Sequence, residues 1–333
     1  MLEIIAIDEA GKWDAVVRSM NQYDFYHLAA YHRLDTLGKA FLLHYHTGNT
    51  AFAWSFILRE IPNTGYCDIT SVYGYAGPLC NRTNPSIEAI TDFQQAIYSY
   101  FDEQKIVSVF ARLHPLLEQK NILQNLGEVS DSNLTVGIDL SLPENEQQQQ
   151  YARSLKTQLN RLKNSRLTIE KANTKEEIDT FIQIYIETMN RVKASLYYYF
   201  SSEYFYRFLS EIDSSLFLAK YNEEIVSGSL CTFTCGIMQA HLNATRNDFL
   251  PQSPLKLVLD FARHEGMNRG MKLLHLGGGK GGSNDSLFEF KSRFSHQHFQ
   301  FRIWRYIHNP IVYNELTQAK SIIVSDFFPA YRS

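Results

Sequence analysis

Apolar and polar residues alternate along the first half of the chain in a pattern that predicts short strands and amphipathic helices. Two aromatic-rich apolar runs, Ala40 to His46 and Ala51 to Leu58, flank Thr47-Gly48-Asn49, which is typical of a β-hairpin. The further elements expected here are a helix over Pro85 to Glu103, opened by Asn84 and Pro85, and strands over Ile106 to Arg112 and Leu134 to Leu140.

The second half repeats this order at the scale of a domain. Two helices precede a three-strand meander, and then come a helix, a strand, a glycine-rich run, a short helix and a last pair of strands. This order indicates an α+β fold with mixed strands. The expected helices are Lys175 to Lys193, Ser202 to Glu211, Ser253 or Pro254 to Gly270 and a short one from Asp285; the expected strands are Leu216 to Tyr221, Ile225 to Thr234, Ile237 to Ala244 and Lys272 to Leu276.

A basic segment separates the two halves. Between Tyr151 and Lys171 there are six Lys or Arg residues and one acidic residue, while Leu155, Leu159 and Leu162 form one apolar stripe at helical spacing. The charges are typical of a solvated helix face, and the segment is also a candidate joint between domains. We therefore expect domains over 1–145 and 171–333, with a basic connecting helix over 146–170.

Composition narrows the class of protein. The chain has 333 residues, which suggests two domains, and its 44% hydrophobic and 20% charged residues are normal for a folded protein. Four cysteines do not form a disulfide framework, and a net charge of −3 argues against a general nucleic-acid coat. Because no apolar run is long enough to span a bilayer and no secretory signal is seen at Met1, we expect a soluble, cytoplasmic protein.

The glycine run Gly277-Gly278-Gly279, continued by Gly281 and Gly282, is the first candidate for chemistry. It matches G-x-G-x-x-G, but it lies near the C-terminus and lacks the acidic residue that a dinucleotide fold needs about 20 positions further on. The Walker pattern also fails. What the glycines offer is backbone that a ligand can approach closely, or else simply a flexible turn.

The segment after the glycine run carries cations beside aromatic rings. On a helix, Phe290 and Phe294 are neighbours, while Lys291 and Arg293 lie on other faces and could meet an anion at the glycines. Taken alone, Lys291 could equally be a solvated surface lysine.

Three other segments suggest a binding site. Tyr73 and Tyr75 alternate with glycines in a stiff loop suited to a ligand, or to packing on its own domain. Arg112 and His114 end a predicted strand, where sites of α/β proteins often lie. Arg191 near Tyr198 could clamp a phosphate or carboxylate, or satisfy helix carbonyls.

The predicted strand Ile237 to Ala244 carries a row of polar side chains. Strand alternation places Gln239, His241, Asn243 and Thr245 on one face of an otherwise buried element, which suggests a ligand cleft. The histidines and cysteines show no ordered metal-ligand set, and no nucleophile elbow or Cys–His pair is found. Neither a metal site nor covalent catalysis is therefore expected.

Together these segments resemble the FemABX-like acyltransferases, in order and over nearly the whole chain. The most specific stretch runs from Lys272 through Gly277-Gly278-Gly279 and Asp285 to Phe290-Lys291 and Phe294. The Tyr73 to Pro78 loop, Thr188 to Arg191 and His241 to Thr245 look like further family features. The resemblance implies an α+β fold of two GNAT-like domains in tandem, each with a mixed, mostly antiparallel sheet flanked by helices.

The family implies transfer of an acyl group to an amine. Its Fem peptidyltransferases move amino acids from aminoacyl-tRNA onto a peptidoglycan precursor. The resemblance associates Phe290 and Lys291 with the tRNA end of the donor, and Arg191 and Tyr198 with phosphates of the precursor. We expect direct aminolysis, with Asp68 or His241 accepting the amine proton and Lys291 or backbone N–H groups stabilising the oxyanion.

Two alternatives remain open from the sequence. Relatives with the tandem fold use acyl-CoA to modify amino sugars or small amines, although Asn247 to Leu255 lacks the glycines that commonly hold the CoA pyrophosphate. A tandem GNAT protein that binds a glycan or partner without catalysis is the other alternative. No tightly bound cofactor is expected; the donor is aminoacyl-tRNA or acyl-CoA, and the acceptor is a cell-envelope precursor.

Overall fold

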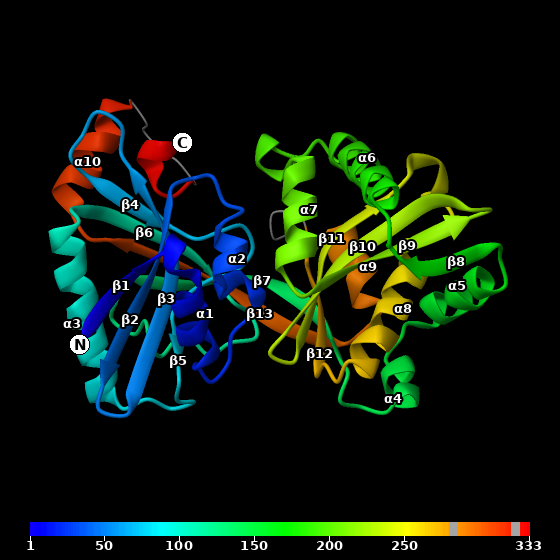
Figure 1. Ribbon diagram of the computed structural model, residues 1–333, viewed down its shortest axis with the longest axis horizontal. Helices are drawn as coiled ribbons and strands as arrows, with labels where there is room; N and C mark the ends of the chain where they lie inside the picture. The colour runs from blue at the N-terminus through cyan, green and yellow to red at the C-terminus, as the bar shows by residue number, and fades with distance from the viewer. Residues whose placement is uncertain (280–284, 321–326) are drawn as a thin grey trace. The chain divides into compact units, whose positions relative to one another are not determined.

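The structure is a computed structural model that describes residues 1–279, 285–320 and 327–333. It divides into two compact units, and each is described by itself. Unit 1 contains residues 1–132 and 300–333, and unit 2 contains residues 133–299. Both are mixed α+β layers in which helices pack on a mostly antiparallel sheet (Figure 1).

Unit 1 is built on a sheet of strand order β1-β2-β3-β4-β6-β13. Every neighbouring pair is antiparallel except β4 and β6, which run parallel. Its strands are β1 (Leu2–Ala6), β2 (Lys39–Thr47), β3 (Thr50–Glu60), β4 (Cys67–Thr70), β5 (Leu79–Cys80), β6 (Ile106–Leu113) and β13 (Gln297–Ile307). Its helices are α1 (Ala10–Arg18), α2 (Ala29–His32), α3 (Ile87–Glu103) and α10 (Pro310–Ala319).

Unit 2 has the corresponding strand order β8-β9-β10-β11-β12-β7, and here β11 and β12 are the parallel pair. Helices α6 and α7 lie on one face of this sheet, and α8 and α5 lie on the other (Figure 1). Its strands are β7 (Glu128–Asp139), β8 (Leu167–Lys171), β9 (Ser214–Tyr221), β10 (Glu224–Thr234), β11 (Ile237–Thr245) and β12 (Leu273–Gly278). Its helices are α4 (Glu144–Gln149), α5 (Arg153–Lys163), α6 (Lys175–Arg191), α7 (Ser202–Glu211), α8 (Leu255–Asn268) and α9 (Ser286–Ser292).

The two units repeat one topology, and their last strands are exchanged. In each unit a strand, two helices, a three-strand meander and a further helix lead to a strand that pairs parallel with the end of the meander. The sixth strand then comes from elsewhere: β7 follows unit 1 in the chain but pairs with β12, whereas β13 follows unit 2 but pairs with β6.

This exchange explains why the compact units differ from the expected ranges 1–145, 146–170 and 171–333. The C-terminal residues 300–333 join unit 1 through β13, and residues 133–170 join unit 2. The basic connecting segment is two helices, α4 and α5, instead of one. Leu155, Leu159 and Leu162 of α5 are buried in the core of unit 2, while the arginines and lysines of that helix are exposed.

Most expected elements are confirmed within a few residues, and the misses have physical causes. The helix expected at Pro85 is capped by Ser86, whose hydroxyl accepts from Ala89 N–H, so it begins at Ile87. Of the expected last strand pair, one strand is β13; Asn309 caps a helix, α10, directly after it, and the residues that follow, 321–326, lie outside the described residues. The strands β1 and β8 at the ends of the sheet order were not expected, since each has five residues and few buried side chains.

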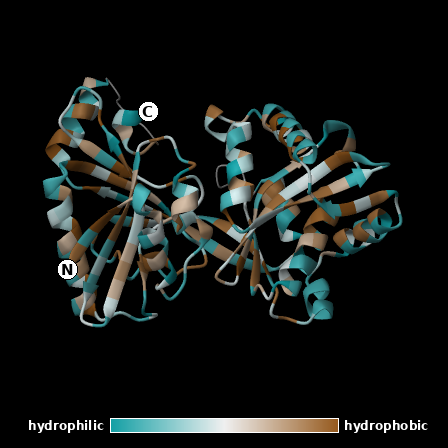
Figure 2. Cartoon of the chain, in the orientation of Figure 1, coloured by the Kyte–Doolittle hydropathy of each residue, from teal (hydrophilic) through white to brown (hydrophobic). Residues whose placement is uncertain are grey.

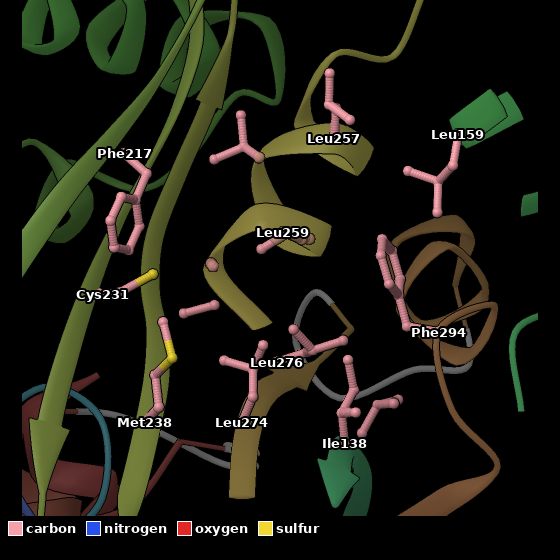
Figure 3. Packing of buried hydrophobic residues seen from close by; sticks show 14 of the residues in the cluster. Ile138, Leu159, Phe217, Cys231, Met238, Leu257, Leu259, Leu274, Leu276 and Phe294 are labelled. Atoms are coloured by element: carbon pink, nitrogen blue, oxygen red, sulfur yellow. The ribbon is translucent and has the colours of Figure 1, made fainter. Parts of the chain in front are cut away.

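Each unit has its own apolar core. In unit 1, Trp54 and Trp304 meet at the centre with 5.2 Å between ring centroids, and Phe93 and Phe101 of α3 pack beside them. In unit 2, Leu257 and Leu259 of α8 belong to one apolar cluster with Met238 of β11 and with Leu274 and Leu276 of β12 (Figure 3). Apolar residues follow the strands and polar residues dominate α4 (Figure 2). No helix among the described residues has the length and apolar character needed to cross a membrane.

Candidate functional site

The parallel pair in unit 2 is short, and its end marks the candidate site. β11 and β12 pair from Ile237 and Leu273 to Gln239 and His275, where the two side chains are joined by a 2.6 Å hydrogen bond between Oε1 and Nδ1. Both strands continue, β11 to Thr245 and β12 to Gly278. In the described part of unit 2, no backbone segment bridges these two strands beyond that pair.

The equivalent place in unit 1 is filled by the chain itself. After β4, the Tyr73 to Pro78 loop returns beside the end of β6, where Ala76 donates to Arg112 O at 2.7 Å and accepts from His114 N–H at 3.2 Å. Gly74 and Gly77 make this path possible, because both have positive φ and a Cβ at either would collide with a side chain. The two units therefore differ at corresponding positions.

The glycines at the end of β12 lie against a lysine. Gly277 and Gly278 were expected in a loop, but both belong to the strand, since they pair with Val136 and Thr135 of β7. The Lys291 ammonium donates to Gly278 O at 2.6 Å, and a Cβ on Gly277 would lie 3.3 Å from Nζ. Gly279 follows the strand directly, and Gly281 and Gly282 lie outside the described residues.

Lys291 is held by the short helix α9. Asp285 caps that helix by accepting hydrogen bonds from Leu287 and Phe288 N–H, at 3.0 and 2.9 Å. Burial lowers the pKa of Lys291 to about 8, against the opposing effect of the Asp285 charge. An ammonium group near its pKa at neutral pH can both stabilise a negative charge and release a proton.

Phe290, the neighbour of Lys291, is part of the packing. Its ring lies 5.9 Å from the ring of Phe294 and 5.7 Å from Nζ of Lys256. Lys256, in the first turn of α8, is only 4% exposed and donates to Gln158 Oε1 at 2.5 Å. Lys256 was not expected from the sequence, since a lone lysine in an otherwise apolar helix is not a motif.

The polar residues of β11 face helix α7 in part. His241 Nε2 lies 3.1 Å from the Tyr204 hydroxyl, and its ring stacks on Phe208 at 5.1 Å. Burial lowers the pKa of His241 to about 3, so its imidazole is neutral at pH 7. Asn243 Nδ2 donates to Ala240 O at 3.3 Å, while its Oδ1 is buried with no hydrogen-bond partner in residues 1–279, 285–320 and 327–333.

The strict alternation of faces that was expected for the polar residues of β11 is interrupted. β10 pairs Leu230 with Leu242 but Cys231 with Ala240, so His241 is an extra residue in a β-bulge. A bulge is not visible in an apolar–polar pattern, because it changes which side chains share a face without changing their order.

Arg191 and Tyr198 lie at the far end of the same strand. The Arg191 guanidinium donates to Thr245 O at 3.0 Å and to Asn247 Oδ1 at 2.5 Å, and so joins α6 to the end of β11. Tyr198 accepts a hydrogen bond at its backbone oxygen from the Tyr185 hydroxyl. Arg191 therefore bonds to β11 instead of the last carbonyls of its own helix.

In unit 1 the structure brings Tyr75 and His114 together. Their rings are 5.4 Å apart, and His114 Nε2 lies 2.9 Å from Asp24 Oδ2. Leu116 N–H donates to His114 Nδ1, so Nε2 carries the proton and donates to Asp24. Burial raises the pKa of Tyr75, and the nearby Arg112 opposes that shift. Tyr73 contributes its carbonyl, which accepts from the Tyr31 hydroxyl.

Asp68, one of the two candidate bases, is buried and paired with cations. Its carboxylate has no exposed surface and accepts from Arg59 Nε at 2.7 Å, Arg332 Nε at 2.6 Å and the Tyr331 hydroxyl at 3.0 Å. A carboxylate with no exposed surface, whose two oxygens already accept from two guanidinium groups and a hydroxyl, has no free face for an acceptor amine. The structure thus gives Asp68 a structural role in attaching the C-terminal segment to β4.

The predicted residues therefore fall into two groups. Unit 2 holds Gly277, Gly278, Phe290 and Lys291 together at the end of β12, and His241, Asn243 and Arg191 along the neighbouring strand β11. Unit 1 holds Tyr73, Tyr75, Arg112 and His114. Asp24 was missed, because its sequence context indicates only a helix cap. Among the described residues, no group of three His, Cys, Asp or Glu side chains is placed to hold a metal ion.

Comparisons with known proteins show the fold. No protein-family model matches the chain, and no curated protein is similar to it in sequence. The crystal structure of FemX is similar with a TM-score of 0.72 and 16% identity, covering 95% of this chain and 99% of that one.

Two further structures are similar over most of their length. A C-terminal domain provisionally assigned to a lysylphosphatidylglycerol synthetase from Agrobacterium fabrum has a TM-score of 0.58 and 13% identity, covering 96% of this chain and 98% of that one. L-PGS from Bacillus licheniformis has a TM-score of 0.57 and 12% identity, covering 91% and 94%. Together with the repeated topology of the two units, these matches show that the chain has the FemABX-like tandem GNAT fold.

Proposed function

We propose that this protein is an acyltransferase that moves an aminoacyl group onto an amine of a cell-envelope precursor. The observation that carries the proposal is the end of the β11–β12 pairing in unit 2, with the Lys291 ammonium on the glycine backbone of β12. Where two neighbouring strands stop pairing, their backbone N–H and C=O groups are available to a ligand, and glycines at that place let the ligand approach the backbone closely. The corresponding place in unit 1 is occupied by its own loop, which favours unit 2 as the donor site.

The reaction is a direct aminolysis. The amine nitrogen of the acceptor attacks the carbonyl carbon of the donor ester, a C–N bond forms, and the C–O bond of the ester breaks to release the donor alcohol. Lys291, with a pKa of about 8, stabilises the oxyanion of the tetrahedral intermediate as an ammonium group. His241 is the remaining candidate for accepting the amine proton, because it is neutral, although its low pKa makes it a weak base.

The start of α8 favours an aminoacyl ester over acyl-CoA as donor. A pyrophosphate is commonly held by unpaired N–H groups at a helix N-terminus. Here Lys256 N–H donates to Ser253 O, and Leu257 and Val258 N–H both donate to Pro254 O. These amides are occupied, and Pro254 has none to offer.

The acceptor class rests on the similar structures. FemX and the lysylphosphatidylglycerol synthetase domain share the fold of this chain at low identity, and the name of the second contains a membrane phospholipid. The sequence also resembles the Fem peptidyltransferases, which act on a cell-envelope precursor. We therefore assign the acceptor amine to a precursor of that compartment, with no tightly bound cofactor.

Calorimetric titration of the full chain with charged tRNA and, separately, with acetyl-CoA tests the donor site. We expect micromolar binding of charged tRNA and none of acetyl-CoA. Lys171→Met, which removes an exposed lysine of unit 2, is expected to keep that affinity. Binding of acetyl-CoA alone would replace the aminoacyl donor by a thioester, and binding of neither would contradict a donor site in this protein.

A further inference from the structure

Two arginines of unit 1 lie on one face of its sheet without a carboxylate partner in the described part of that unit. β6 and β13 pair with Arg112 opposite Ile303 and Phe110 opposite Arg305, so Arg112 and Arg305 occupy diagonal positions on the same face. Side chains at such positions start about 7–8 Å apart, within reach of each other for residues as long as arginine. Within residues 1–279, 285–320 and 327–333, neither side chain makes an ion pair or a hydrogen bond.

Arg305 is the more unusual of the two. Its Nε is buried and has no hydrogen-bond partner in the part of the chain that the structure describes. A buried donor left unpaired costs free energy, and two like charges on neighbouring strands add to that cost. Such a group in a folded protein calls for an explanation, and a bound ligand is one.

Three other arginines of the same unit are paired with carboxylates. Arg59 and Arg332 both meet Asp68, and Arg302 meets Asp131 at 2.9 Å. Arg302 is adjacent to Ile303 in β13, but it lies on the opposite face of the strand, because strand side chains alternate. The described residues thus supply a carboxylate to these three guanidinium groups and none to Arg112 and Arg305.

Aromatic rings flank this pair of arginines. The positive charge of Arg112 lowers the pKa of the nearby Tyr75, against the larger effect of burial, and the ring of Tyr75 lies 5.6 Å from the ring of Phe301. At the other end, the ring of Phe328 lies 6.3 Å from that of Phe110, which is opposite Arg305. Apolar walls reduce the effective dielectric and strengthen the attraction of the two cations for an anion.

We propose that Arg112 and Arg305 bind a phosphate or diphosphate group of a ligand. Two guanidinium groups carry two positive charges, which a phosphate dianion neutralises completely. A monocarboxylate would neutralise only one of them. Their planar N–H donors fit phosphate oxygens in pairs. The site lies wholly within unit 1, and the inference does not depend on the proposed acyl transfer.

Titration of the full chain with inorganic phosphate, inorganic diphosphate and ADP tests this site, with succinate as a dicarboxylate control at constant ionic strength. We expect phosphate or diphosphate to bind and succinate to bind more weakly; tighter binding of ADP than of diphosphate would identify a nucleotide as the source of the group. Arg112→Met and Arg305→Met are each expected to weaken binding about 10- to 100-fold, the effect of losing one charge-assisted contact.

The matched control is Arg302→Met, which removes a guanidinium from the opposite face of the same strand and is expected to keep the affinity. Thermal unfolding without ligand adds a second readout: Arg305→Met should not lower the midpoint, because the arginine that it removes pairs with none of the described residues. If Arg305→Met does not fold, Arg112→Met alone decides. Unchanged affinity in Arg112→Met, equal loss in Arg302→Met, equal binding of succinate, or no binding at millimolar phosphate and diphosphate would each overturn the proposal.

Discussion

Replacing Lys291 by methionine is expected to lower the rate of acyl transfer by about 100-fold, the scale for losing one preorganised electrostatic donor. Methionine keeps the length and apolar character of the side chain, so packing of α9 against β12 should survive. What is lost is the ammonium group on Gly278 O. Steady-state rates with saturating donor and acceptor measure the effect, and the unfolding midpoint shows whether the fold is intact.

The pH dependence gives Lys291 a second readout. Because its pKa is about 8, the charged form predominates below pH 8 and is lost as the pH rises above that value. The wild-type rate should therefore fall above about pH 8, whereas the residual rate of Lys291→Met should lack this decline. A folded Lys291→Met protein with a near-normal rate and an unchanged alkaline limb would remove Lys291 from the mechanism.

Replacing Asp68 by alanine is expected to destabilise unit 1 by about 3–5 kcal/mol, the range for removing one partner of a buried ion pair. The carboxylate has no exposed surface, and its loss leaves Arg59, Arg332 and the Tyr331 hydroxyl without their acceptor. Chemical denaturation measures the change in unfolding free energy. In the fraction that stays folded, the rate of acyl transfer should be close to that of the wild type.

Asp213→Ala is the matched control for this prediction. Asp213 pairs with Arg269 in unit 2, but its side chain is 59% exposed, so its removal should cost less than about 1 kcal/mol. The structural role of Asp68 would be contradicted if Asp68→Ala kept the stability of the wild type and lost activity, since that is the behaviour of a catalytic base.

Local features of the fold could be predicted from the sequence because they depend on neighbouring residues. The turn at Thr47-Gly48-Asn49 joins β2 to β3, and the meander of unit 2 lies where the apolar runs placed it. The exchange of β7 and β13 could not be predicted in this way. Both strands read as apolar segments at the end of a domain, and their partners are decided by pairing across a large part of the chain.

In the candidate site, too, contacts between neighbouring segments could be predicted from the sequence, and contacts between distant segments could not. A position of Lys291 beside the glycines was one of two interpretations of the sequence, since a short helix can return directly to the strand before it; the contact with Gly278 O agrees with that interpretation. Asp24 and His114 are 90 positions apart, and Arg112 and Arg305 are brought together by strand pairing between distant segments, so no local motif indicates either pair. The pairing of Asp68 with Tyr331 and Arg332 could not be predicted either, because these partners lie 263 and 264 positions further along the chain.

The most direct test of the account is the transfer reaction itself. The full chain is incubated with charged tRNA and a cell-envelope precursor that carries a primary amine. The mass of the precursor is then measured by mass spectrometry, and the amount of uncharged tRNA is quantified in the same samples. The account predicts a precursor heavier by one aminoacyl residue for each tRNA discharged, at a rate that Lys291→Met lowers about 100-fold. Discharge and product no faster than without protein, although the charged tRNA binds, would contradict it.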